Sequence, residues 1–108
     1  MTDQEPSSGA SRNRQFDRVL FSGHAVRRMF RRGLTSEHVL NVIRHGEVIA
    51  DYPDDTPYPS RLLLGYAESR PVHVVLAVDR ETRTAIVVTA YEPDAQIWDE
   101  DFRNRRQP

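Results

Sequence analysis

The spacing of apolar residues along this 108-residue chain changes from helical to strand-like at Glu47. Over about residues 23–45, apolar residues recur every three or four positions, which is typical of helices that bury one face. After Glu47 they form short runs divided by polar, turn-like segments such as ESRP and RETR, as β-strands do. Separators this short cannot hold a parallel crossover, so we expect antiparallel hairpins. The pattern as a whole predicts an α+β domain.

Two helices are expected in the first half, over about residues 23–32 and 36–45. Their expected boundary residues are Ser22 and Gly33 for the first helix, and Thr35 or Ser36 and Gly46 for the second. Arginine or histidine fills the last turn of each helix, where the helix dipole favours cations. We expect Val26, Met29 and Phe30 of the first helix to face the core.

The second half predicts strands over about residues 48–52, 61–67, 72–79 and 84–91, and a short strand near Phe16 precedes the helices. The runs VHVVLAV and AIVVTAY are continuously apolar, which favours central strands. A last helix is expected over about 95–105, with Ile97, Trp98 and Phe102 packed on the sheet. The expected architecture is therefore a pair of N-terminal helices on a four-stranded antiparallel sheet, followed by a C-terminal helix.

Composition limits the class of protein further. Residues 1–14 are polar and lack periodicity, so we expect a flexible arm followed by a single α+β domain over 15–106. The sequence has no cysteine, and no apolar run is long enough to cross a membrane, which favours a cytoplasmic protein. There is no glycine-rich phosphate loop, and the four histidines lack metal-ligand spacing. We therefore expect no nucleotide cofactor and no metal.

The charges are segregated along the chain, although the net charge is only −1. All 15 basic residues are arginine, and seven of them lie in residues 12–32 against a single acid, Asp17. Residues 47–55 and 92–101 carry acidic residues and no basic ones. A basic segment of this kind offers a site to phosphate groups or to an acidic partner.

The first helix places His24, Arg28 and Arg32 on one face, with Arg27 and Arg31 on the neighbouring row. Guanidinium groups bind phosphate oxygens in pairs, and an imidazole transfers protons near neutral pH, so this face suits a phosphodiester. The alternative is a solvated amphipathic helix whose polar face is rich in arginine.

His73 interrupts an apolar strand, so it is either a hydrogen-bonded core histidine or a group presented from one face of the sheet. Tyr91 is the last residue of the next expected strand, and Thr89 lies two residues before it. Whether His73 and Tyr91 share a face depends on the register across the RETR turn, which the sequence leaves open. The segment RMFRRGLTSEHVLNVIRHG also fits a helix-turn-helix superficially, although the second half of the domain is mainly strand and lacks the third helix on which such motifs usually pack.

Five blocks in order resemble a bacterial domain family of unknown function, number 4258. They are HAVRRMFRRG (24–33), GEVI (46–49), YPSRL (58–62), VHVV (72–75) and TAYEPD (89–94). The resemblance extends from about Phe21 to Arg106. The family is similar in layout to the RelE/ParE/BrnT-type toxins of toxin–antitoxin pairs, in which two N-terminal helices lie against a four-stranded antiparallel sheet.

The resemblance implies a metal-independent endoribonuclease, in which the ribose 2′-hydroxyl attacks the adjacent phosphate. It implies RNA as substrate and a cognate antitoxin as partner. Carried over by position, His24 or His73 would transfer protons, Arg28 and Arg61 would stabilise the phosphate, and Tyr91 would orient or stack a base.

Two other interpretations stay open. The protein is alternatively a non-catalytic module that binds nucleic acid or protein through the basic segment 12–32, including Arg27, Arg31 and Arg32. In the third interpretation, His24, His73 and Tyr91 form a buried hydrogen-bonded set that only specifies the fold.

Overall fold

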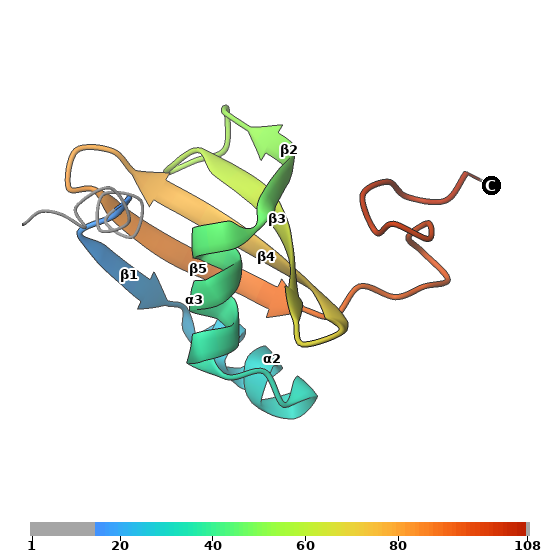
Figure 1. The fold of residues 1–108 in the computed structure, drawn as a ribbon. Helices are drawn as coiled ribbons and strands as arrows, with labels where there is room; N and C mark the ends of the chain where they lie inside the picture. The colour runs from blue at the N-terminus through green and yellow to red at the C-terminus, as the bar shows by residue number, and fades with distance from the viewer. Residues whose placement is uncertain (1–14, 108) are drawn as a thin grey trace, which may run out of the picture.

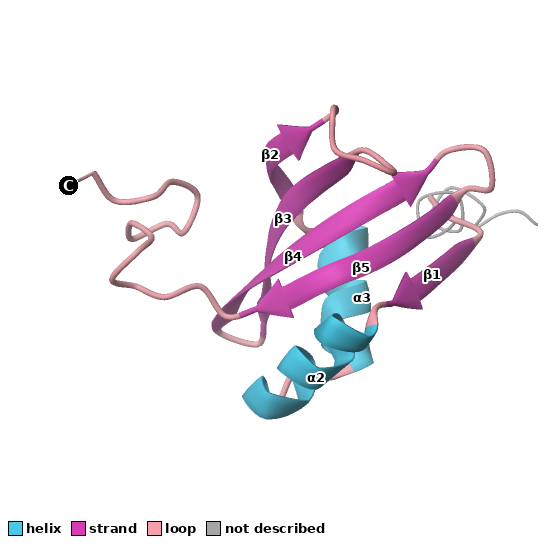
Figure 2. Cartoon of the chain, turned by 180° about the vertical axis from the view of Figure 1, so that it is seen from behind, coloured by secondary structure: helices cyan, strands magenta, loops and turns pink. Residues whose placement is uncertain are grey.

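The computed structural model describes residues 15–107. Its elements are β1 (Arg18–Phe21), α2 (Gly23–Arg32), α3 (Ser36–His45), β2 (Glu47–Tyr52), β3 (Ser60–Ala67), β4 (Arg70–Asp79) and β5 (Thr84–Tyr91). The strands form one five-stranded sheet in the order β1-β5-β4-β3-β2 (Figure 1). α3 packs across β3 and β4, and α2 packs beside β5 (Figure 2).

The prediction of a four-stranded antiparallel sheet is wrong, because the sheet is five-stranded and mixed. β2, β3, β4 and β5 pair antiparallel in sequence order, as their short connections require. β1 joins this sheet as a parallel neighbour of β5, with Arg18 opposite Thr84 and Phe21 opposite Val87. The short strand near Phe16 was expected, but its alternation carries no information about which distant strand it pairs with.

Both helices begin and end close to the expected residues. The Ser22 hydroxyl accepts a hydrogen bond from the Ala25 N–H at 3.0 Å, and Gly33 closes α2 in the left-handed conformation, with φ of 68°. Thr35, rather than Ser36, caps α3 in a reciprocal pair with His38. Gly46 follows α3 for a different reason, because a Cβ there would lie 2.5 Å from the Val42 carbonyl oxygen.

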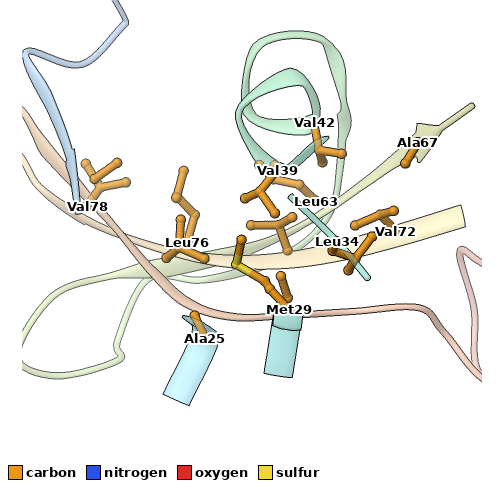
Figure 3. Close-up of a cluster of buried hydrophobic side chains, with 14 residues drawn as sticks. Ala25, Met29, Leu34, Val39, Val42, Leu63, Ala67, Val72, Leu76 and Val78 are labelled. Carbon is orange, nitrogen blue, oxygen red and sulfur yellow. The ribbon is translucent and has the colours of Figure 1, made fainter. Parts of the chain in front are cut away.

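The core lies between the helices and one face of the sheet (Figure 3). Alternate residues of β4 face the helices, as the period of a strand requires, and all are buried: Val72, Val74, Leu76 and Val78. Ala25 and Met29 of α2 belong to the same buried cluster as Val39 and Val42 of α3. The intervening β4 residues, His73 among them, therefore point to the opposite face, which α3 does not cover.

The predicted core stripe of α2 is wrong at two of its three positions. Met29 is buried, but Val26 is 50% exposed and Phe30 is 84% exposed. α2 lies beside β5 rather than across the sheet, so only the narrow stripe of Ala25 and Met29 has a surface to pack against. Phe30 is consequently left in solvent, on a helix rich in arginine.

The predicted C-terminal helix is also wrong, since residues 93–107 contain turns and a single isolated bridge, Trp98 to Arg105. Aspartate side chains accept backbone N–H groups here: Asp94 from Gln96, and Asp101 from Arg103. These short side chains compete with helical hydrogen bonds for the backbone donors. Asp94 and Asp101 therefore hold a folded loop where a helix was expected.

The expected arm, residues 1–14, lies outside the described residues. Within the described part of the chain, neither helix is long and apolar enough to cross a membrane.

Candidate functional site

The register between β4 and β5 resolves the question left open by the RETR turn. His73 lies directly opposite Tyr91, so both side chains point to the face of the sheet away from α3. Thr89 lies opposite Val75 on this same face. The His73 side chain is fully buried, whereas Tyr91 is half-buried and reaches solvent.

Both ring nitrogens of His73 are occupied. Nε2 lies 2.8 Å from the Phe102 carbonyl oxygen, and Nδ1 lies 3.2 Å from the Tyr91 hydroxyl. A carbonyl oxygen only accepts, so Nε2 carries the proton and Nδ1 of the neutral ring accepts from Tyr91. Burial lowers the His73 pKa, and the hydrogen bond to Phe102 opposes this shift. His73 is therefore a neutral, fixed ring that holds the Tyr91 hydroxyl.

Two aromatic rings enclose the same imidazole. The Tyr91 ring centre lies 5.3 Å from that of His73, and the Trp98 ring centre lies 4.5 Å away on the covering C-terminal segment. Both contacts are edge-on, a favoured arrangement of aromatic rings. Trp98 was expected to pack back on the sheet, and it does so from a loop rather than from a helix.

Arg28 of α2 reaches the same face of the sheet as Tyr91. Its guanidinium carbon lies 4.7 Å from the centre of the Tyr91 ring, and Nη1 donates to the Thr89 hydroxyl at 3.4 Å. Burial raises the pKa of the Tyr91 phenol, while the positive charges of Arg28 and Arg105 oppose the rise. The phenol is consequently protonated at neutral pH, and the Arg28 guanidinium lies over its ring.

The structure brings three of the five predicted catalytic residues into contact: Arg28, His73 and Tyr91. His24 is exposed, one helical turn before Arg28 on the same side of α2. Arg61 lies apart from this cluster. It faces Leu76 across the strands and shares the α3 side of β3 with Leu63, whereas His73 is on the other face.

The four arginines of α2 have no ion-pair partner in the described part of the chain. The ion pairs found there join Arg70 to Glu92, Arg83 to Asp17, and Arg103 to Glu47 and Asp101. Arg27, Arg31 and Arg32 are exposed, and Arg28 is half-buried against β5. We call these four residues, Arg27, Arg28, Arg31 and Arg32, the arginine row.

The residues that sequence reasoning missed all lie after Tyr91. Phe102 contributes a backbone oxygen to His73, and no side-chain pattern marks such a role. Arg105 lies with its guanidinium carbon 5.5 Å from the Trp98 ring centre, which only the fold of the C-terminal segment determines.

The fold and this site define an α+β domain in which the arginine row, without an ion-pair partner among residues 15–107, lies beside a buried histidine and its tyrosine. Residues 21–92 match the family described as Domain of unknown function (DUF4258), and the chain belongs to that family. No curated protein matches the chain significantly, and no solved structure does so either.

Proposed function

We propose that the protein binds single-stranded RNA along α2 and cuts it as a metal-independent endoribonuclease of the toxin type. The observation that carries the proposal is the arginine row, which has no carboxylate partner among the described residues and reaches the Tyr91 phenol through Arg28. Like charges so close together repel one another, and a phosphate backbone would neutralise them.

The exposed Phe30 ring supports a single-stranded ligand. Phe30 and Val26 lie one turn apart, on the flank of α2 opposite to the flank that carries Arg28 and Arg32. Arg27 and Arg31 lie between these flanks on the solvent side. Proteins that bind single strands combine cations that follow the backbone with aromatic rings on which bases stack. A strand crossing α2 would meet both.

The proposed reaction is attack of the ribose 2′-oxygen on the adjacent phosphorus. The bond from phosphorus to the 5′-oxygen breaks, leaving a 2′,3′-cyclic phosphate and a 5′-hydroxyl. His24, which is exposed, takes the proton of the 2′-hydroxyl, and water protonates the departing 5′-oxygen. Arg28 stabilises the charge that develops on the phosphate oxygens. His73 is a positioning residue, because it holds Tyr91 under Arg28 and both its nitrogens are occupied.

The test uses the purified full chain with a fluorescein-labelled single-stranded RNA and a DNA of the same sequence. We expect the RNA to be bound and cut in the presence of EDTA, and the DNA to be bound but left intact because it lacks the 2′-hydroxyl. His24→Gln should abolish cutting and keep binding, whereas Arg28→Gln should weaken both. Arg80→Gln is the matched control, since Arg80 is exposed in the β4–β5 turn, at the other end of these strands from Tyr91.

A second candidate function, a non-catalytic nucleic-acid-binding module, is favoured by the occupation of both His73 nitrogens. Binding of RNA without any cleavage would support this candidate and refute the nuclease. Expression in a bacterial host separates the two as well. A toxin should arrest growth and fragment RNA, and a cognate antitoxin with an acidic segment should bind the arginine row and relieve the arrest.

A further inference from the structure

The C-terminal segment, residues 93–107, lies outside the family match yet covers the site. Three contacts hold it to the sheet: the Phe102 carbonyl oxygen on His73, the Trp98 ring against the same imidazole, and Arg103 on Glu47. The last contact is bidentate, with Nη2 to Oε1 at 2.8 Å and Nε to Oε2 at 3.1 Å. This segment is therefore docked at three points along one end of the sheet.

The docked segment presents Arg105 next to the site. The backbones of Arg105 and Trp98 form an isolated antiparallel β-bridge. The guanidinium carbon of Arg105 lies 5.5 Å from the centre of the indole ring. Arg28 takes the equivalent position 4.7 Å from the Tyr91 ring. Both rings contact the same His73 imidazole, so each guanidinium is separated from this buried histidine by one aromatic ring. Arg105 is exposed and has no carboxylate within ion-pair distance among residues 15–107.

We propose that Arg28 and Arg105 together bind a single phosphate group above Tyr91, so that the C-terminal segment supplies half of an anion site. Each guanidinium carbon lies over an aromatic ring, and although Arg28 Nη1 donates to Thr89, the other N–H groups of Arg28 can still donate to a ligand. The geometry has support from the electrostatics of Tyr91, since burial raises the pKa of its phenol and the charges of both arginines oppose that rise. The identity of the ligand as an RNA phosphate rests on the proposed function; the two-arginine site itself does not.

The experiment measures binding of the labelled RNA to the full chain across a range of salt concentrations. Arg105→Gln should weaken binding about tenfold and reduce the salt slope by about 0.7, the value expected for one lost phosphate contact on a single strand. Arg105→Lys should keep the salt slope of the unmodified chain and weaken binding less than Arg105→Gln. Arg80→Gln, with the same loss of charge away from the site, provides the baseline.

Inorganic pyrophosphate is the second probe, and Trp98, the single tryptophan, is its fluorescent reporter. We expect saturable quenching or enhancement that both Arg28→Gln and Arg105→Gln abolish. An emission maximum unchanged in Arg105→Gln shows that Trp98 stays docked and that the loss is a loss of contact.

The outcomes separate the two proposals. RNA binding that Arg105→Gln and Arg80→Gln reduce equally overturns the two-arginine site and leaves the proposed function intact. A chain that binds no RNA, but binds pyrophosphate in an Arg105-dependent manner, refutes the proposed function and keeps the site. Pyrophosphate binding that is absent, or is unaffected by Arg105→Gln, refutes the site in that case.

Discussion

Replacing His73 by glutamine should change how the stability of the protein depends on pH. The folded protein keeps this imidazole neutral, because burial lowers its pKa below the ordinary value of 6.5. The unfolded chain binds a proton near pH 6.5, so it binds more protons than the folded chain below that pH, and stability falls as the pH falls. Glutamine has the same hydrogen-bonding types and does not titrate.

The magnitude follows from one proton of difference. One proton changes the free energy of unfolding by about 1.4 kcal/mol per pH unit. His73 does not reduce the free energy of unfolding well above pH 6.5. At pH 5.5 it reduces the free energy of unfolding by about 1.4 kcal/mol, provided that the folded ring stays neutral. The loss continues downward until the lowered pKa of the folded state is reached. Glu47 and Asp101 have pKa values lowered from 4.5 and 3.8, so their contributions are lost below this window.

The assay is urea unfolding followed by Trp98 fluorescence and circular dichroism, at intervals between pH 5.5 and pH 8. The quantity of interest is the wild-type free energy of unfolding minus that of His73→Gln, so any constant loss of stability in the variant cancels from the slope. A difference that stays flat across this window would refute the neutral buried histidine. A difference that grows as the pH falls would show instead that the fold stabilises the imidazolium. If the variant does not fold, nuclear magnetic resonance titration of His73 in the wild type gives the same answer.

Four further variants test core packing, the two helix-terminal glycines and the docking of the C-terminal segment. Leu76→Ala should lower the free energy of unfolding by about 2–5 kcal/mol, because Leu76 is 1% exposed at the centre of the core; urea unfolding measures this. Gly33→Ala should lose only about 1 kcal/mol, since its φ of 68° is strained but no atom lies within 4 Å of the new Cβ. Gly46→Ala should lose more, because its Cβ would meet two backbone oxygens at 2.5 and 2.8 Å. Glu47→Gln should shift Trp98 emission to the red, because Arg103 then loses its bidentate partner and the C-terminal segment loosens.

Each of these has its own control. Val88→Ala, at a 40% exposed position, should be much milder than Leu76→Ala. The order of the two glycine variants is the test of the backbone argument, and a larger loss at Gly33 would contradict it. High salt should shift the wild-type Trp98 emission in the direction of Glu47→Gln, and an unchanged spectrum in the variant would show that Arg103 does not hold the segment.

Local signals predicted the two N-terminal helices and the strand positions well, but not the C-terminal segment. Caps and terminal glycines determined α2 and α3 because those interactions are made within a few residues of each other. The parallel pairing of β1 with β5 was beyond such signals, since it joins residues more than sixty positions apart. The helix predicted in the C-terminal segment is wrong because aspartate side chains also accept backbone N–H groups in turns, as Asp94 and Asp101 do here.

The candidate site was predicted in part. Helical period placed His24 and Arg28 on one side of α2, and the structure keeps that arrangement. The contact between His73 and Tyr91 depends on the register between β4 and β5, which the sequence does not determine. Arg61 lies on the opposite face of the sheet from His73, because the period of a strand does not say which face meets the helices. Arg105 had no sequence signal, since its position depends on the docking of Trp98.

The parallel strand β1 determines at which residue a shortened fragment of this domain can begin. The family match begins at residue 21, so a fragment limited to residues 21–92 would lose nearly all of β1. The edge of β5 that β1 covers over residues 84–87 would then be exposed, while the other edge stays paired with β4. An exposed strand edge of this kind is a template for self-association between chains. Expression of the matched region alone should therefore yield aggregates, whereas a fragment that starts at residue 15 keeps β5 covered.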